Sequence, residues 1–188
     1  MNFDNLVIVH GFLAASNSHW FPWLKGQYER SNIQVIVPEM PESHAPSPHL
    51  WQEKLQQSIP NPNERTLFIG HSLGCIATLR YISSLPDDVT IGGVVLISGF
   101  SEKLPTLPEL STFTDVNLDF RLFIQKIKQR IVVLSLNDEI VPPQFTLNLS
   151  QKICAELYGF PDGGHFLDRD GFTVFPNLEK VLKDNSML

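Results

Sequence analysis

The segment that decides the fold is Thr66-Leu67-Phe68-Ile69-Gly70-His71-Ser72-Leu73-Gly74. An apolar strand pattern runs into a serine with a glycine two residues away on either side, and a helical pattern, Leu73–Ser84, leaves it. Gly70 and Gly74 lack the side chains that would collide in a sharp turn from strand to helix. Such a turn strains the serine backbone and holds the Ser72 hydroxyl above the sheet, as a nucleophile requires. The alternative is a Gly-Ser turn that only connects the two elements.

Short apolar runs recur along the chain and predict strands that are buried on both faces. The runs are Leu6–Val9, Val35–Val37, Leu67–Ile69, Val94–Ile97, Ile131–Leu134 and, more weakly, Glu156–Phe160. The helix-length segments are Trp20–Arg30, Pro48–Ser58, Leu73–Ser84, Asp119–Gln129, Pro142–Ile153 and Phe172–Lys183. This alternation predicts an α/β fold with one doubly wound sheet of about six mainly parallel strands and helices on both faces. We expect a single domain over residues 1–188.

Two connections break this regularity. The segment Pro38–Pro48 carries four prolines, so we expect a stiff surface loop. The segment Gly99–Asp119 is the longest irregular connection, and it follows a strand at the carboxyl edge of the sheet. Ligands bind at that edge in open α/β sheets, so this segment is a candidate lid.

Composition and charge exclude several classes of protein. The net charge is −6 and no run rich in Lys or Arg occurs, which argues against nucleic acid or an anionic membrane as partner. No apolar stretch reaches 18 residues, and the first residues lack the features of a secretory signal, so we expect a cytoplasmic protein. Cys75 and Cys154 lie in apolar helical patterns, so we expect buried thiols and neither a disulfide nor a metal site.

Two further residues complete a predicted catalytic triad with Ser72. Asp138 follows the apolar strand near Ile131–Leu136, and His165 follows the last strand, so all three lie at carboxyl ends of parallel strands. His165 would take the serine proton, and Asp138 would hold the imidazole tautomer. Asp138 could instead serve as a helix cap or turn residue, with Glu139 as the nearest substitute acid, and His165 could be an ordinary loop histidine.

Backbone amides near Ser72 are candidates for an oxyanion hole. Leu73 N–H lies at the start of the helix that leaves the turn, where negative charge is stabilised. Phe12 N–H is the second candidate, because His10-Gly11 ends the first strand as the HG motif of esterases does. An ordinary strand-ending turn is the alternative reading of His10-Gly11.

Apolar residues at the same edge suggest a substrate pocket. Gly11, Trp20, Phe100 and Phe166 flank the proposed reaction centre and would favour small, largely apolar substrates. Packing in the core is the alternative for Trp20. No metal or cofactor is expected to take part.

The chain also resembles a known family, the YdeN-like and retinoblastoma-binding-protein-9-like small serine hydrolases of the α/β-hydrolase superfamily. The resemblance rests on Val9-His10-Gly11, Ser18-His19-Trp20-Phe21-Pro22-Trp23-Leu24-Lys25, Met40-Pro41, Trp51, Gly70–Gly74, Val95–Phe100, Leu104-Pro105-Thr106-Leu107, Asn137–Pro142 and Gly163–Leu167. It implies a cap-less α/β-hydrolase fold with a triad of Ser72, Asp138 and His165, and no settled natural substrate. The Leu-x-Cys-x-Glu-type segment linked to protein binding in one branch is absent from this sequence, so that partner is not carried over.

Three functional hypotheses follow. The first is a serine hydrolase that cleaves small carboxylic esters through an acyl-enzyme intermediate. The second is an aminopeptidase or amidase with the same triad, in which Glu39, Glu42 or Glu102 would bind a substrate amine. The third is a non-catalytic module that binds proteins on a hydrolase scaffold. The expected partner is a small ester or amide, and no protein partner is identified.

Overall fold

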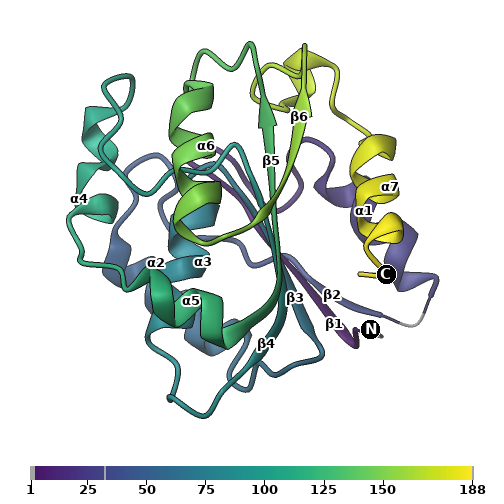
Figure 1. Cartoon of the computed structure of the whole chain (residues 1–188). Coiled ribbons are helices and arrows are strands. Elements are labelled where there is room, and N and C mark those ends of the chain that lie inside the picture. Colours follow the sequence, from purple (N-terminus) through teal and green to yellow (C-terminus); the bar gives the residue numbers. More distant parts are fainter. Residues whose placement is uncertain (1–2, 32, 188) are drawn as a thin grey trace.

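A single parallel sheet between two layers of helices forms the protein (Figure 1). The computed structural model describes residues 3–31 and 33–187. The predicted α/β class and the number of strands are confirmed, since the described residues form six parallel strands in the order β2-β1-β3-β4-β5-β6. The single-domain prediction includes positions 1, 2, 32 and 188, which lie outside the described residues, and it stays a prediction.

The strands form where the sequence is most continuously apolar. They are β1 (Asn5–Val9), β2 (Gln34–Ile36), β3 (Thr66–His71), β4 (Ile91–Ile97), β5 (Ile127–Ser135) and β6 (Glu156–Phe160). Every residue of β3 and β4 is buried, as a strand covered on both faces requires. Val9 pairs with Gly70 and His71 pairs with Ile97, so the carboxyl ends of these three strands lie side by side.

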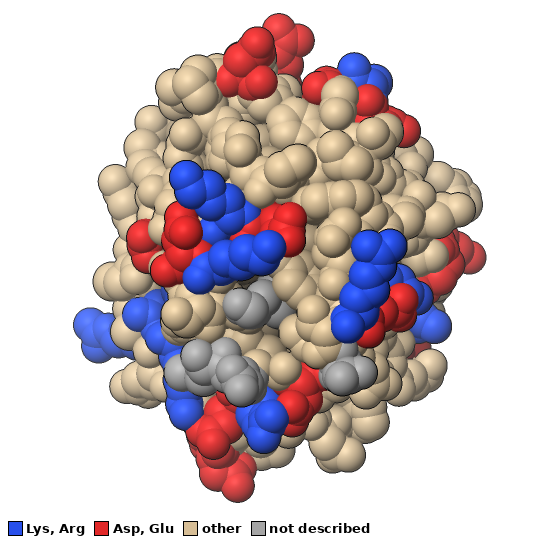
Figure 2. Space-filling view, turned by 90° about the vertical axis from the view of Figure 1, so that its right-hand side faces the viewer, with Lys and Arg blue, Asp and Glu red and all other residues tan. Residues whose placement is uncertain are grey.

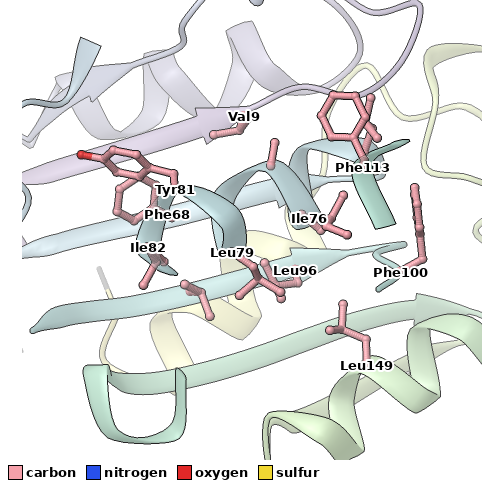
Figure 3. Packing of buried hydrophobic residues seen from close by; sticks show 14 of the residues in the cluster. Val9, Phe68, Ile76, Leu79, Tyr81, Ile82, Leu96, Phe100, Phe113 and Leu149 are labelled. Atoms are coloured by element: carbon pink, nitrogen blue, oxygen red, sulfur yellow. The ribbon is translucent and has the colours of Figure 1, made fainter. Parts of the chain in front are cut away.

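The described residues form seven α-helices. They are α1 (Phe21–Glu29), α2 (Pro48–Ser58), α3 (Leu73–Ser83), α4 (Ser111–Thr114), α5 (Phe120–Lys126), α6 (Pro143–Lys152) and α7 (Pro176–Asp184). The helices α1 and α7 lie on one face, and α2, α3, α5 and α6 lie on the other (Figure 1). Figure 3 shows Ile76 and Leu79 of α3 packed among Phe68 and Leu96 of the sheet and Leu149 of α6.

Two predicted helices are shorter than expected. The helix predicted over Asp119–Gln129 ends at Lys126, because Ile127 is fully buried and pairs with Ile91, which starts β5 earlier than the apolar run suggested. Asp119 is the N-cap of α5 and accepts hydrogen bonds from two backbone N–H groups. The helix predicted over Phe172–Lys183 begins at Pro176, after a 3₁₀ turn at residues 168–170.

The two long connections differ in character. Pro38–Pro48 contains no strand and meets α2 only at its last residue, as predicted. Gly99–Asp119 is more ordered than an irregular loop, since it contains a 3₁₀ turn (Pro108–Leu110) and α4. Its buried side chains Leu104, Leu110 and Phe113 anchor it to the core.

The cysteines follow the prediction only in part. Cys75 is buried in α3, whereas Cys154 is exposed and follows α6 with a φ of 50°. The apolar pattern that predicted a buried Cys154 ends at Ile153, because the chain turns there toward β6.

The surface carries mixed charge. On the face formed by α1 and α7, acidic and basic side chains lie beside one another (Figure 2). Lys25 pairs with Glu29 on α1, and Lys183 pairs with Glu179 on α7. No helix among residues 3–31 and 33–187 is long and apolar enough to cross a membrane.

The start of α3 packs closely against the end of β1. A Cβ atom at Gly74 would lie 2.1 Å from the carbonyl oxygen of Val9 and 2.7 Å from that of His10. Both distances are far below van der Waals contact, and backbone atoms cannot swing away as a flexible side chain can. A glycine at position 74 is therefore required for the helix to begin where it does.

We predict that Gly74→Ala lowers the free energy of unfolding by about 1 to 3 kcal/mol, because the added methyl overpacks the turn. Urea-induced unfolding measures this change. Gly26→Ala in α1 is the matched control, since a Cβ there meets no atom within 4 Å. The control should gain about 0.5 to 1 kcal/mol from helix propensity. Equal effects of the two substitutions would contradict the close-packing argument.

Candidate active site

Ser72 occupies a strained turn between β3 and α3. Its backbone has φ 54° and ψ −120°, a conformation that non-glycine residues rarely adopt. The N–H of Ser72 donates to the carbonyl of Ile97 at 2.9 Å, which ties the turn to the end of β4. Ser72 is 4% exposed. The predicted strain at this serine is confirmed.

Asp138 uses its two carboxylate oxygens for different partners. Oδ1 accepts hydrogen bonds from the backbone N–H groups of Ile140 at 3.0 Å and Val141 at 2.9 Å. Oδ2 lies 2.7 Å from Nδ1 of His165. A carboxylate can only accept, so Nδ1 of His165 carries a proton, and in the neutral imidazole Nε2 is then the acceptor. Asp138 is thus a turn residue and a histidine partner at once.

The loop that carries His165 is held by several hydrogen bonds. Its backbone N–H donates to Oδ2 of Asp170 at 2.9 Å, and its carbonyl accepts from Nε2 of His71 at 2.8 Å. The N–H of Gly163 donates to Oγ of Ser135 at 2.8 Å. His165 itself is 6% exposed. The imidazole is therefore fixed by its backbone as well as by Asp138.

His71 is a buried histidine that stays neutral. Burial lowers its pKa well below the ordinary value of 6.5, because the charged form loses its hydration. The carbonyl of His165 can only accept, so Nε2 of His71 carries the proton. Nδ1 of His71 is buried without a hydrogen-bond partner among the described residues. His71 thus links the turn at Ser72 to the His165 loop.

The loop after β1 lies directly beside Ser72. A Cβ atom at Gly11 would lie 2.9 Å from Cβ of Ser72 and 3.5 Å from its Oγ. His10 fixes this loop, because its Nδ1 donates to the carbonyl of Gly11 and its Nε2 accepts from the N–H of Met40. The chain on the amino side of Phe12 is therefore held against the turn at Ser72.

Ser72 and His165 line one cavity of about 290 Å³. The lining residues are Gly11, Phe12, Leu13, Ala14, His19, His71, Ser72, Leu107, Ile140, His165, Leu167, Asp168 and Arg169. Leu107 belongs to the Gly99–Asp119 segment, so part of this connection reaches the cavity. Of the predicted pocket residues, Gly11 lies in the wall.

Three predicted pocket residues are placed elsewhere. Trp20 and Phe166 are fully buried in the core cluster under α1 and α7, and Phe100 is fully buried in the cluster under α3. A side chain with no exposed area cannot line an open cavity, so these three assignments are wrong. The cause is that an aromatic residue near a strand end gives the same signal whether it faces the core or a ligand.

The glutamates proposed to bind a substrate amine, and the substitute acid Glu139, do not line this cavity. Glu39 accepts from the N–H of Ser16, and Glu102 contacts Asn148 and Lys152. Glu42 does not line the cavity either. Glu139 lines a neighbouring pocket that also contains His165. The described residues contain no group of three His, Cys, Asp or Glu side chains that could hold a metal ion.

Several cavity residues were missed by the sequence reasoning. They are Leu13, Ala14, Leu107, Ile140, Leu167, Asp168 and Arg169. Most of them follow a predicted site residue by one to four positions, because each loop at the carboxyl edge contributes consecutive residues. Their proximity to Phe12, Asp138 and His165 in sequence was the available signal.

Similarity to known proteins extends over nearly the whole chain. A family model described as serine hydrolase matches residues 6–184. The protein YdeN of Bacillus subtilis (strain 168) is 40% identical over 175 residues, which is 93% of this chain and 92% of YdeN. Serine hydrolase RBBP9 of Rattus norvegicus is 25% identical over 166 residues, which is 87% of this chain and 84% of RBBP9. The crystal structure of the ydeN gene product has a TM-score of 0.94 at 38% identity and covers 98% of this chain and 100% of its own.

We predict that the protein loses stability as the pH falls below about 6.5. His71 binds a proton in the unfolded chain at this pH but not in the folded protein, because its pKa is lowered by folding. The free energy of unfolding therefore falls by up to about 1.4 kcal/mol per pH unit from this group. His10 and His19 act in the same direction, because burial lowers the pKa of each. Urea unfolding at pH 7.5 and pH 5.5 measures the effect.

His71→Gln should weaken this pH dependence, because glutamine keeps an N–H for the His165 carbonyl and does not titrate. His44→Gln, at an exposed histidine, is the matched control and should behave as the parent does. An unchanged pH dependence in His71→Gln would show that His71 contributes nothing to it.

Proposed function

The chain belongs to the serine hydrolase family, and from that premise we propose that it cleaves small carboxylic esters through an acyl-enzyme formed on Ser72. One observation carries the proposal: the imidazole of His165 is held at 2.7 Å by Asp138 and lines the same cavity as the strained Ser72. Such a constellation generates a nucleophile from an ordinary hydroxyl at neutral pH.

The proposed reaction begins when Ser72 Oγ attacks the ester carbonyl carbon. Nε2 of His165 takes the hydroxyl proton as the new C–O bond forms. The tetrahedral intermediate then collapses, the bond to the leaving alcohol breaks, and His165 returns the proton to that oxygen. Water attacks the acyl-enzyme in the same way and frees Ser72. Asp138 stays ionised throughout and stabilises the imidazolium.

Negative charge on the tetrahedral intermediate requires hydrogen-bond donors that are already in place. We assign this role to the backbone N–H groups of Phe12 and Leu73. Leu73 is the first residue of α3, whose first N–H groups have no acceptor within the helix. The close approach of Gly11 to Ser72 supports the choice of Phe12. Fixed donors of this kind lower the barrier without having to reorient.

The cavity supports small acyl or alcohol groups. Its volume of about 290 Å³ is at the lower end of ligand pockets, and Phe12, Leu107 and Ile140 make part of its wall apolar. The proposed steps need only Ser72, His165 and Asp138, the backbone N–H donors and water, so no metal or cofactor enters them. An amidase would use the same triad of Ser72, Asp138 and His165. Glu39, Glu42 and Glu102, the acids expected to bind a substrate amine, do not line this cavity, and the carboxylate that does, Asp168, lies 3.4 Å from Nδ1 of His19. The absence of the three expected acids from the wall supports the ester over the amide.

We predict that Ser72→Ala lowers the turnover of p-nitrophenyl butyrate by about 10⁴-fold to 10⁶-fold, or about 5 to 8 kcal/mol of barrier. An alkyl fluorophosphonate should label the parent at Ser72 with one equivalent and should not label the variant. Ser101→Ala, after β4 at the same edge of the sheet, is the control and should keep full turnover. Unchanged turnover in Ser72→Ala would overturn the assignment of the nucleophile.

Asp138→Asn should lower kcat by about 10⁴-fold while the protein stays folded. The asparagine oxygen can still accept from Ile140 and Val141, but its amide donates to Nδ1 and moves the imidazole proton to Nε2. A protonated Nε2 cannot take the serine proton. Glu139→Gln is the matched control, and a larger loss there than in Asp138→Asn would identify Glu139 as the acid instead.

Leaving-group preference separates the remaining hypotheses. We expect aryl esters to be cleaved faster than the aminoacyl anilides of the same acyl size. Faster cleavage of anilides would favour the amidase. Failure of both substrates and of the fluorophosphonate label would favour a binding module on a hydrolase scaffold.

A further inference from the structure

His19 lies in the cavity wall, and the proposed triad does not use it. Its backbone has a φ of 53°, so a non-glycine residue is held in the left-handed region next to the reaction centre. Its ring packs edge-on against Phe21 and His71, with centroids 5.6 Å and 5.8 Å away. The side chain is 13% exposed. Strain that is retained in a tightly packed cavity residue points to a role for its side chain.

The hydrogen bonds of His19 determine its tautomer. The backbone N–H of Asp168 donates to Nδ1 at 3.1 Å, whereas the carboxylate oxygen Oδ1 of Asp168 is farther from the same atom, at 3.4 Å. The shorter contact assigns an unprotonated Nδ1. Burial lowers the pKa of His19, more than the neighbouring Asp168 carboxylate raises it. The ring is therefore neutral at pH 7, and its single proton is on Nε2.

The other ring nitrogen of His19, Nε2, is left free by the neighbouring described residues. It forms no hydrogen bond with another described residue, and it does not belong to the buried polar atoms that lack a partner. It is therefore accessible to solvent in a cavity that also exposes Ser72 and His165. A neutral residue with an unpaired N–H donor thus forms part of the cavity wall that a substrate would contact.

We propose that His19 Nε2–H donates a hydrogen bond to a second oxygen of the substrate, so that the protein prefers esters with an ether, hydroxyl or carbonyl oxygen near the scissile carbonyl. This inference rests on the proposed function. Much of the surrounding wall is apolar, with Phe12, Leu107 and Ile140 in it. A substrate without the second oxygen would remove water from the donor and leave it unpaired, which costs binding in the transition state.

His19 acts here as a specificity-determining residue and transfers no proton. Its Nδ1 is occupied by Asp168, and its Nε2 already carries a proton, so it has no free site to serve as a base. Asp168 and Arg169 also line the cavity and are the charged residues that such a substrate would meet.

Two matched substrate pairs test the proposal. In each pair a single CH₂ group is replaced by oxygen. On the acyl side the pair is p-nitrophenyl butyrate and p-nitrophenyl methoxyacetate, and on the alcohol side it is butyl butyrate and 2-methoxyethyl butyrate. The variants are His19→Phe, which keeps an aromatic ring without a donor, and His19→Gln, which keeps an N–H near the position of Nε2. The measured quantity is the ratio of kcat/KM for the two esters of a pair. Comparing this ratio between the parent and each variant removes the difference in intrinsic reactivity between the two esters.

In His19→Phe we expect kcat/KM for the oxygen-containing member of one pair to fall about threefold to tenfold relative to its partner, the effect of one neutral hydrogen bond. His19→Gln should retain most of the parental preference. The pair that responds shows whether the acyl or the alcohol side meets His19. Thermal unfolding of both variants checks that the fold is intact.

The same factor of loss for all four substrates in His19→Phe would overturn the proposal, because a merely structural histidine would act that way. Unchanged ratios in an active His19→Phe variant would overturn it as well, and they would leave the proposed ester hydrolysis standing. Absence of both turnover and fluorophosphonate labelling in the parent would overturn both proposals together.

Discussion

The backbone of Ser72 is the constraint on which the site depends. A positive φ at a serine is unfavourable, and it persists because its surroundings leave no alternative. The N–H of Ser72 donates a hydrogen bond to the carbonyl of Ile97 at the end of β4, and Gly74 packs against the carbonyls at the end of β1. The helix α3 is buried along most of its length. Burial of α3 between the sheet and its neighbouring helices offsets the local cost. Packing thus maintains the strained turn, and Ser72 lines the cavity there.

The position of His165 follows from a second set of constraints. Asp138 holds the ring, while Asp170 and His71 hold the backbone on either side of it. His71 belongs to the same turn as Ser72, so one buried neutral histidine couples the serine and the His165 loop. Because burial disfavours the charged form of His71, the folded state that contains this link loses stability in acid.

Strained residues gather around the cavity. Leu13, His19 and Ser72 all have positive φ and all line it. Leu13 is also an exposed large hydrophobic residue, in keeping with a cavity mouth that is partly apolar. A few polar groups with fixed orientation in an otherwise apolar wall are the usual means by which a small pocket selects its ligand. In the function proposed above, the cavity combines the reaction centre with a donor, Nε2–H of His19, that discriminates among substrates.

The sequence by itself determined the alternation of strands and helices, the turn at Ser72, and the placement of Asp138 and His165 after later strands. These features are local, or they follow from parallel topology, which brings the carboxyl ends of strands to one edge. Only the tertiary structure decided that Trp20, Phe100 and Phe166 face the core, since an apolar residue type does not reveal which side it will bury. Strand pairing at Ile127 shortened a predicted helix, and the tautomers of the histidines depend on partners that are distant in sequence, such as Asp168 for His19. Contacts between segments far apart in the chain leave no local pattern, and for that physical reason they had to be seen in the folded protein.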